Sequence, residues 1–478
     1  MPGMTAEPAS TQHAPAEEAL DPARFRGLPS VERLASDASL SRWGSPPAAR
    51  AAARIAIDEA RAAVAAGVPQ PAAAELVAAT AALLERWLSP GPQRVINATG
   101  VILHTNLGRA PLSDAARAAL AAAAGYCAVD FDLESVARSS RQEHLRPLLR
   151  AVSGAEDGLA VTNNAAAIFL VLRALCHRRE VLLSRGEAVA IGDGFRIPSI
   201  VATSGVRLVD VGTTNRTTVD DYRSAITDRT VAILRVHPSN FTISGFAERP
   251  SIAECAELAH ARNLLLIDDV GSGWLDMPDG LRQNGDSEPV VRDVVAAGAG
   301  IVTCSADKLC GGPQAGLIFA STTTIEKLRR HPMARVVRPD KLVVAALAAT
   351  LAGYVRGTAA EELPVLRMMT LPLIDIEGRA RAWCTDLQAH GLPAAASPSA
   401  SAVGGGALPA ASLPTLCVTL PDRAGALHHS LARQQPPVVG RVVRGRLWLD
   451  PRTVDPAEDE IVVSAVMNAW AATGTAAP

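Results

Sequence analysis

The feature that most constrains this chain is the alternation of short apolar strand patterns with helical patterns in its central part. Seven strand patterns occur, at residues 158–162, 181–184, 206–211, 231–236, 264–270, 300–305 and 315–320. Strands that alternate with helices in this way predict a doubly wound α/β domain, with a mainly parallel sheet and helices on both faces. The composition agrees, because 48% of the residues are apolar and only 3% are aromatic, which favours a core of Ala, Val and Leu. Ligands of such sheets bind at the carboxyl ends of the strands.

Composition and pattern divide the 478 residues into four predicted regions. Residues 1–27 are rich in Pro, Ala, Ser and Glu and predict a disordered tail, while residues 28–90 carry the apolar spacing of a small helical domain. Residues 91–365 are predicted to form the large domain that contains the sheet. Residues 366–478 predict a smaller C-terminal α/β domain, interrupted by a Pro/Ser/Gly-rich segment at 393–412.

Lys308 stands between the sixth strand pattern and a glycine-rich turn, in the segment Ser305-Ala306-Asp307-Lys308-Leu309-Cys310-Gly311-Gly312. The chain has only three lysines among its 46 basic residues, and only a lysine amine can form a Schiff base with a carbonyl cofactor. The other two, Lys327 and Lys341, lie in helical contexts that are typical of solvated side chains. Spacing alone leaves two interpretations of Lys308 open: a reactive amine at the end of a strand, or a surface lysine beside a turn.

Two more motifs lie at the carboxyl ends of predicted strands. Asp268 and Asp269 end the pattern at 264–270, where a carboxylate must be paired or solvated to stay ionised. The turn Thr162-Asn163-Asn164-Ala165-Ala166-Ala167 joins the first strand to a helix, so its backbone N–H groups could face a phosphate. Each motif is common by itself. A phosphate turn, an aspartate and a lysine in this order on one alternating sheet form a much more specific pattern.

Net charge and cysteine content restrict the partners. A formal net charge of -2 gives no overall attraction to nucleic acid, so an RNA contact needs a local basic surface, and no DNA partner is expected. Seven arginines at 24–61 offer such a surface, although acidic residues nearly cancel them, so a solvated helix face is the other interpretation. Seven scattered cysteines without a CxxC spacing indicate reduced cytoplasmic thiols and no metal site. Neither a signal peptide nor a membrane span is expected.

The chain resembles the bacterial selenocysteine synthase family, the L-seryl-tRNA(Sec) selenium transferases. The segment around Lys308 is similar, almost residue for residue, to the family's pyridoxal-phosphate lysine segment. The string Leu28-Pro29-Ser30-Val31-Glu32-Arg33-Leu34 resembles the family's opening, and His104-Thr105-Asn106-Leu107-Gly108-Arg109 resembles one of its most recognisable motifs. The resemblance runs from Leu28 to the last helix. The sequence departs from the family's pattern at 126–130, at 137–141 and at Cys310. These differences affect the contacts that the resemblance implies with the tRNA end or a partner subunit.

The resemblance implies an aspartate-aminotransferase-like fold, the fold type I of enzymes that use pyridoxal 5'-phosphate (PLP). It implies that Lys308 binds PLP and takes the Cα proton of the substrate, with Asp307 as a second candidate for proton transfer. Asp269 is implied to pair with the pyridinium nitrogen of the cofactor. Further cofactor contacts are expected from Asn164, Ala165 and Ala166 at the phosphate and from His237, for which a purely structural role is the alternative. Arg109, Arg335 and Arg338 are implied to hold an oxyanion of the selenium donor.

The implied reaction converts seryl-tRNA(Sec) to selenocysteinyl-tRNA(Sec) by PLP-dependent β-replacement through an aminoacrylate intermediate, with selenophosphate as selenium donor. The helical domain at 28–90 is implied to bind tRNA, and the relatives' rings of dimers imply a cytoplasmic homo-oligomer such as a decamer. One rival is a PLP-dependent lyase of the same superfamily that acts on a small amino-sugar acid and needs neither the N-terminal helices nor tRNA. The other is a catalytically silent RNA-binding protein, against which the presence of both Lys308 and Asp269 argues.

Overall fold

The computed structural model describes residues 22–89, 91–191, 194–243, 245–276, 288–409, 411–421 and 425–474. The predicted disordered tail at 1–27 lies outside the described residues except for 22–27, where Pro22–Phe25 form a 3-10 helix. The chain divides into two compact units, Met1–Arg94 and Val95–Pro478. They are called unit 1 and unit 2 below.

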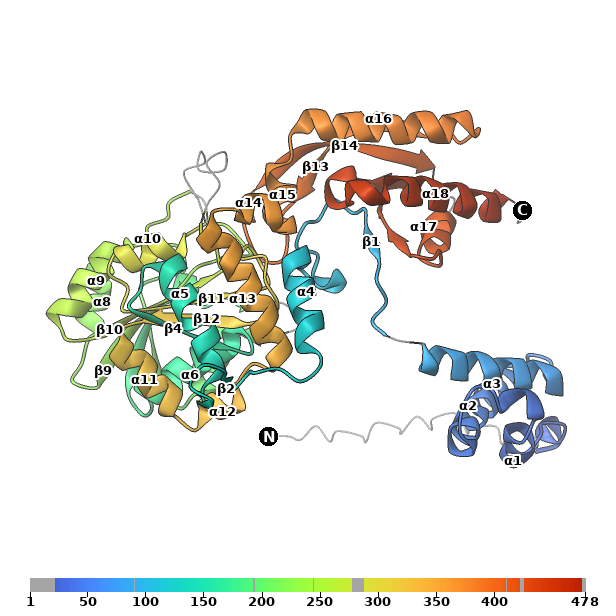
Figure 1. The fold of residues 1–478 in the computed structure, drawn as a ribbon, viewed down its shortest axis with the longest axis horizontal. Helices are drawn as coiled ribbons and strands as arrows, with labels where there is room; N and C mark the ends of the chain where they lie inside the picture. The colour runs from blue at the N-terminus through green and yellow to red at the C-terminus, as the bar shows by residue number, and fades with distance from the viewer. Residues whose placement is uncertain are drawn as a thin grey trace, which may run out of the picture. The chain divides into compact units, whose positions relative to one another are not determined.

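Unit 1 is helical, as its apolar spacing predicts. Its α-helices are α1 (Val31–Ala35), α2 (Pro46–Ala65) and α3 (Ala73–Leu88), shown at the blue end of the chain in Figure 1. Ser30 caps α1 through its side-chain oxygen, and Pro46 occupies the first turn of α2, where its missing N–H costs nothing. The buried stripe of α2 consists mainly of alanines, which pack closely against Leu76, Leu83 and Leu84 of α3.

The centre of unit 2 is a seven-stranded sheet with the order β4, β12, β11, β10, β9, β5, β8. Its strands are β4 (Asp157–Val161), β5 (Glu180–Ser184), β8 (Arg207–Val211), β9 (Thr230–Val236), β10 (Leu265–Gly271), β11 (Ile301–Ser305) and β12 (Gly316–Ala320). Each lies within one residue of its predicted position. All neighbours pair in parallel except β12, which is antiparallel to both β4 and β11. The predicted α/β fold class, with a mainly parallel sheet, is confirmed.

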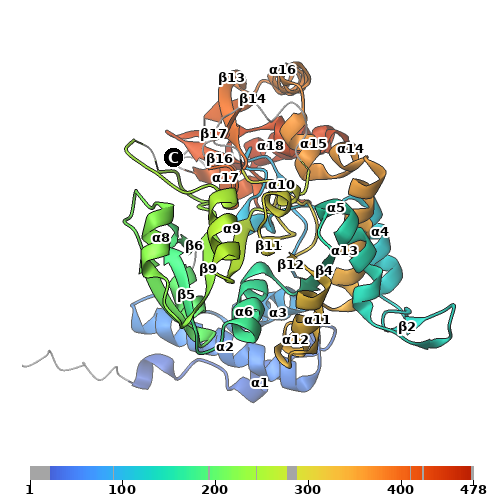
Figure 2. The ribbon, with the colours of Figure 1, turned by 90° about the vertical axis from the view of Figure 1, so that its left-hand side faces the viewer.

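Helices cover both faces of this sheet (Figures 1 and 2). One face packs against α6 (Asn164–Leu175), α7 (Ile197–Thr203) and α11 (Thr322–Arg330). The other packs against α5 (Arg146–Ser153), α10 (Val291–Ala296) and α13 (Lys341–Arg356) at the β4 end, and against α8 (Val219–Ala225) and α9 (Ile252–Ala261) at the β8 end. Burial on both sides explains why most of these strands read as mainly apolar runs, whereas the edge strand β8 is partly exposed and carries Arg207 and Asp210.

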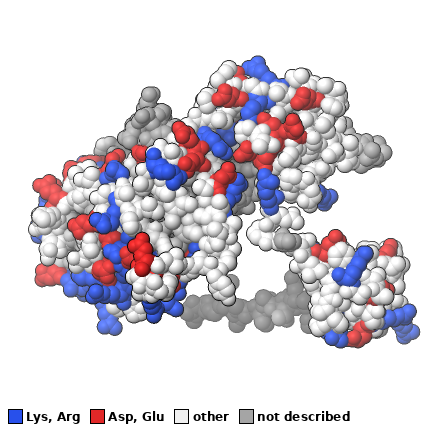
Figure 3. All heavy atoms as spheres, viewed as in Figure 1, with Lys and Arg blue, Asp and Glu red and all other residues white. Residues whose placement is uncertain are grey.

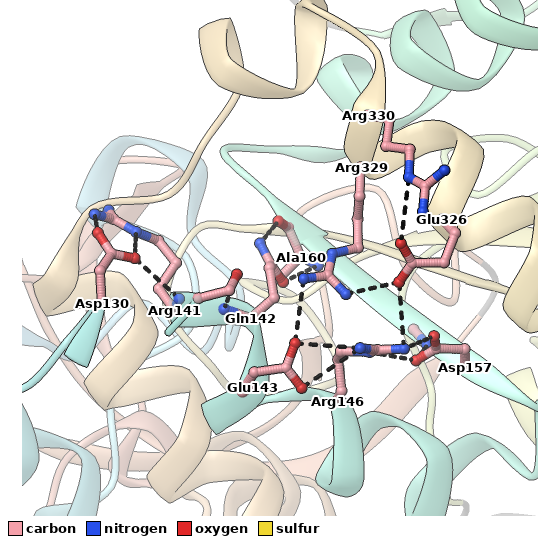
Figure 4. Close-up of polar contacts among 12 residues, drawn as sticks. Asp130, Arg141, Gln142, Glu143, Arg146, Asp157, Ala160, Glu326, Arg329 and Arg330 are labelled. Atoms are coloured by element: carbon pink, nitrogen blue, oxygen red, sulfur yellow. Dashed lines mark hydrogen bonds and ion pairs between the residues drawn. The ribbon is translucent and has the colours of Figure 1, made fainter. Parts of the chain in front are cut away.

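The β4 edge of the sheet is buried and is covered by side chains (Figure 4). The Gln142 amide accepts from the backbone N–H of Ala160 at 3.1 Å and donates to its carbonyl at 2.8 Å, which satisfies edge groups that would otherwise be open to another strand. At the start of β4, burial disfavours the charged form of Asp157, but hydrogen bonds from Arg146 and the Gly158 N–H outweigh it and hold the pKa of Asp157 below its ordinary value.

The C-terminal part of unit 2 holds a four-stranded antiparallel sheet with the order β13, β14, β17, β16. Its strands are β13 (Ala395–Ala402), β14 (Ser412–Pro421), β16 (Arg441–Val443) and β17 (Arg446–Leu449), and its helices include α16 (Leu373–Ala389), α17 (Ala426–Leu431) and α18 (Asp459–Gly474). Strand β13 lies in the Pro/Ser/Gly-rich segment at 393–412, where composition gave no sign of a strand. Pairing with β14 along eight residues holds it there.

Short elements complete unit 2. They include β1 (Ile96–Asn97), α4 (Asp114–Ala123), the hairpin of β2 (Phe131–Asp132) and β3 (Ala137–Arg138), the antiparallel pair of β6 (Ala190–Ile191) and β7 (Phe195–Arg196), α12 (Met333–Val336), α14 (Ala359–Glu362) and α15 (Pro364–Thr370). β1 pairs in parallel with β15 (Val438–Val439), so the start of unit 2 joins its C-terminal part. Within the described ranges, no helix is long and apolar enough to cross a membrane.

Candidate functional site

Lys308 lies three residues beyond the end of β11, in a segment held tightly by backbone hydrogen bonds. Leu309 N–H donates to the Ser272 carbonyl at 3.0 Å, and Gly312 N–H donates to the Ala306 carbonyl at 2.8 Å. The residue is only 5% exposed, and its Nζ donates to the Gly406 carbonyl at 3.2 Å. Burial lowers the pKa of Lys308, with a further lowering by Arg109, while Asp269 opposes this shift. Of the two interpretations, the structure excludes a solvated surface lysine.

Asp269 lies on the neighbouring strand β10, in register with Thr303 of β11. Its Oδ1 accepts from the Asn164 side-chain amide at 2.7 Å and from the Gly271 N–H at 3.1 Å. Burial raises the pKa of Asp269 from 3.8 to about 6, although the Asn164 hydrogen bond and the Lys308 charge both lower it. A buried carboxylate beside a buried amine can therefore be ionised at neutral pH and can hold a cationic group.

The neighbouring Asp268 has a different environment, because successive side chains of a strand point to opposite faces. Its Oδ2 forms an ion pair with Arg235 Nε at 3.1 Å, without the angle of a hydrogen bond. Both side chains are buried, and Arg235 also donates to the Pro250 carbonyl at 2.8 Å. Asp268 is thus placed as an internal counter-ion of Arg235.

The turn after β4 has the geometry of a helix N-terminus. Asn163 caps α6 by accepting from the Ala166 N–H at 2.8 Å, and α6 begins at Asn164. Ala165 and Ala166 lie in the first turn, where small side chains leave the backbone accessible. A Cβ at Gly316 would lie 2.2 Å from the Asn163 carbonyl oxygen, so only glycine lets β12 approach this turn so closely.

Arg109 is brought to the Lys308 segment by the loop at 104–110. Its Nη1 forms a hydrogen-bonded ion pair with Asp307 Oδ2 at 2.6 Å, and the Ala110 N–H donates to the Asp307 carbonyl at 3.3 Å. The Arg109 side chain is 35% exposed and that of Asp307 is 10% exposed. The Asp307 carboxylate is therefore paired with Arg109 of the same chain, and both residues lie beside Lys308.

Arg335 and Arg338 lie in a second basic cluster. The segment that carries them is bonded to the turn after β4 by a 2.9 Å hydrogen bond from the Thr162 N–H to the Val337 carbonyl. Nη1 of Arg338 lies 3.9 Å from Oδ2 of Asp130. Burial and the charges of Arg141 and Arg335 lower the pKa of Arg338. Basic side chains gather along the lower edge of unit 2 in Figure 3. Arg109 pairs with Asp307, whereas Arg338 lies near Asp130, so the two clusters have different carboxylate partners.

His237 follows β9, and its backbone N–H donates to the Asp269 carbonyl at 2.9 Å. Its Nε2 lies 3.3 Å from Oε2 of Glu288, a residue that the sequence did not single out. The same Oε2 accepts from the Leu408 N–H at 3.1 Å. Glu288 thus fastens His237 to the loop at 404–408.

The loop at 404–408 is the second feature that sequence reasoning missed. Gly404, Gly405 and Gly406 all have positive φ, and the Gly406 carbonyl meets the Lys308 amine. A Cβ at Gly405 would lie 2.7 Å from the Leu103 Cβ, so the loop packs too closely for a side chain. Three consecutive glycines in an otherwise Pro/Ser-rich segment were the only signal in the sequence.

These residues fit PLP. A helix N-terminus, a buried carboxylate and a buried amine with lowered pKa suit the phosphate, the ring nitrogen and the carbonyl carbon of that cofactor. The Oδ1 of Asn164 and the Oγ of Ser272 are buried without a hydrogen-bond partner in the described part of the chain. Unmet polar groups at these positions are expected where a polar ligand belongs.

Curated relatives share this sequence over most of its length. The L-seryl-tRNA(Sec) selenium transferase of Nitratidesulfovibrio vulgaris is 45% identical over 387 residues, which cover 79% of this chain and 82% of the relative. That of Methylocella silvestris is 44% identical over 448 residues, which cover 90% of this chain and 94% of the relative. The second match covers more than unit 2 alone, so it extends into unit 1.

A solved D-glucosaminate-6-phosphate ammonia-lyase matches with a TM-score of 0.55 and 22% identity, covering 80% of this chain and 98% of that one. At this identity the likeness shows the fold alone. The family model described as SelA, L-seryl-tRNA selenium transferase, matches residues 95–455. The chain belongs to the L-seryl-tRNA selenium transferase family, whose members are PLP-dependent transferases.

Proposed function

We propose that this protein is a PLP-dependent enzyme that converts seryl-tRNA(Sec) to selenocysteinyl-tRNA(Sec) with selenophosphate as selenium donor. The observation that carries the proposal is the pair formed by Lys308 and Asp269, both buried at the carboxyl ends of adjacent strands, in a chain of this family. When bound, PLP supplies an electron sink that makes the Cα proton of the serine acidic and lets its hydroxyl leave.

The residues of this chain do the remaining work. Burial lowers the pKa of Lys308, which favours the neutral amine, and a neutral amine can take a proton from Cα and return it. Asp269 keeps a negative charge where the ring nitrogen of the cofactor would lie. The Arg109 guanidinium holds Asp307 beside the lysine, where the carboxyl is a candidate to donate a proton to the leaving hydroxyl.

Arg109, Arg335 and Arg338 are assigned to the selenophosphate. A guanidinium matches an oxyanion with two parallel N–H donors, and Arg338 is only partly neutralised by Asp130 at 3.9 Å. Arg109 lies beside Asp307, whereas the other two lie on the segment bonded to the turn after β4. Because the relatives that the sequence resembles assemble as rings of dimers, we assign this protein to a homo-oligomer built from dimers, in which the active site lies at a subunit interface.

Unit 1 is assigned to the tRNA. Its seven arginines between 24 and 61 are all exposed, as phosphate contacts require. Only two of the seven form ion pairs among the described residues, Arg50 with Glu32 at 3.7 Å and Arg61 with Asp58 at 3.2 Å. Aminoacyl-tRNA is used in translation, so the enzyme acts in the cytoplasm.

The deciding experiment incubates the PLP-loaded protein with seryl-tRNA(Sec) and selenophosphate and identifies the aminoacyl group by mass spectrometry. Selenocysteine on the tRNA is the expected product, and Lys308→Ala is the matched inactive control. Release of ammonia from an amino-sugar acid, without any change in the tRNA-bound serine, would instead establish the lyase.

A further inference from the structure

The loop at 404–408, called the glycine loop below, is the part of the C-terminal region that touches the reactive amine. The Gly406 carbonyl accepts from Lys308 Nζ at 3.2 Å, and a Cβ at Gly406 would lie 3.6 Å from the same nitrogen. An amine that takes a proton from Cα must aim its lone pair at that proton, and the hydrogen bonds that its N–H groups donate set this direction. The position of the Gly406 carbonyl therefore affects how the amine meets Cα.

The backbone of the glycine loop is strained at Leu408. Gly404, Gly405 and Gly406 have φ angles of 76°, 62° and 70°, and Leu408 has a φ of 48°. Glycine adopts this left-handed region freely, whereas leucine adopts it only at a cost in free energy. Such residues persist where the surrounding contacts hold them, and they gather at functional sites. Leu408 is half-buried and lines a cavity of about 920 Å³, so apolar packing does not surround it and a polar contact is needed.

Glu288 supplies the polar contact that holds Leu408. Its Oε2 accepts from the Leu408 N–H at 3.1 Å and lies 3.3 Å from Nε2 of His237. Glu288 is only 2% exposed, so water does not compete for this oxygen. His237 is in turn joined to β10, because its backbone N–H donates to the Asp269 carbonyl at 2.9 Å. One buried oxygen therefore ties the glycine loop to the strand that carries Asp269.

We propose that Glu288 is a positioning residue for Lys308. By accepting from the Leu408 N–H, it keeps the glycine loop in its strained conformation, in which the Gly406 carbonyl directs the Lys308 amine. The contacts of Glu288 are with the loop and with His237, so it acts through them and not by moving a proton itself. The catalytic consequence rests on the proposed function, in which the Lys308 amine takes the Cα proton of the serine and returns it.

The first test measures access to the Lys308 amine in the full-length protein after removal of PLP. Acetic anhydride labels the three lysines, and mass spectrometry gives the rate at Lys308 relative to the exposed Lys327 in the same sample. The charge of Glu288 raises the pKa of Lys308, so variants are compared in pairs of equal charge. Lys308 is expected to react about tenfold faster in Glu288→Ala than in Glu288→Gln, because only glutamine keeps an oxygen that can accept from Leu408.

A second pair keeps the charge and serves if Glu288→Ala fails to fold. Glu288→Asp draws the carboxylate back by one methylene, so Lys308 is expected to react faster in this variant than in the wild type. Glu361→Ala, which removes an exposed carboxylate on α14, is the control and keeps the wild-type rate. Equal rates at Lys308 within each pair that folds would overturn the inference.

The second test is kinetic and uses the PLP-loaded protein. Glu288→Ala is expected to lower kcat about tenfold at saturating seryl-tRNA(Sec) and selenophosphate, with both KM values and the visible absorbance of bound cofactor unchanged. Glu288→Gln keeps most of the wild-type kcat. An equal loss of kcat in both variants would overturn the catalytic consequence. A wild type that forms no selenocysteinyl-tRNA would overturn the proposed function, while the labelling comparison still decides whether Glu288 positions the amine.

Discussion

Replacing Asp269 by asparagine removes its negative charge, which we expect to stabilise the cofactor-free fold and to weaken binding of the cofactor. The change keeps an oxygen that can accept from Asn164 and Gly271, so the hydrogen bonds at 2.7 and 3.1 Å are retained. What it removes is a buried carboxyl whose pKa is raised from 3.8 to about 6 by burial. Because the folded pKa lies above the unfolded one, the carboxyl favours the folded state while it is protonated, and this contribution is lost as the pH rises through about 6.

A shift from 3.8 to about 6 corresponds to about 3 kcal/mol of unfolding free energy. Roughly 1.5 kcal/mol of this is lost between pH 5 and pH 8, and the rest is lost at lower pH. We therefore expect Asp269→Asn to gain stability relative to the cofactor-free wild type, and to gain more at pH 8 than at pH 5. The same variant is expected to bind PLP poorly, because a neutral amide cannot hold a protonated ring nitrogen.

The assay is urea unfolding of the cofactor-free proteins at pH 5 and pH 8, followed by near-ultraviolet circular dichroism. Unit 1 is the same in both proteins, so its contribution cancels in the difference. Asp386→Asn, an exposed carboxylate on α16, controls for the general effect of removing a charge. An Asp269→Asn protein with the pH dependence of the wild type, or with undiminished PLP affinity, would refute the reasoning.

Three further changes test the other assignments. Lys308→Ala is expected to abolish the visible absorbance of bound cofactor and its trapping by borohydride, whereas Lys327→Ala keeps both. Arg335→Ala and Arg338→Ala are expected to weaken the use of selenophosphate about ten- to a hundredfold, with binding of seryl-tRNA unchanged and only partial rescue by lysine. Steady-state rates with selenophosphate varied would show no difference from wild type if these arginines were only a solvated surface. Deletion of residues 1–90 is expected to leave PLP binding intact and to weaken tRNA(Sec) binding strongly in a filter-binding titration; unchanged affinity would move the tRNA site to unit 2.

The sequence by itself determined the central sheet. Seven apolar runs predicted the seven strands of this sheet to within one residue, because most of these strands are buried on both faces and need a mainly apolar sequence; β8 alone among them is largely exposed or half-buried. The order of strands along the chain then placed Asp269 and Lys308 at the same edge. Composition did not predict β13, because its pairing with β14, and not its own residues, makes it a strand.

Only the tertiary structure decided which groups meet at that edge. Glu288 contacts His237 and the Leu408 N–H across separations that leave no periodic signal, and the Gly406 carbonyl reaches Lys308 from the C-terminal part of unit 2. The pairing of Arg109 with Asp307 has the same origin. Periodicity reports which side of an element is buried, whereas these contacts depend on where loops from distant parts of the chain are packed.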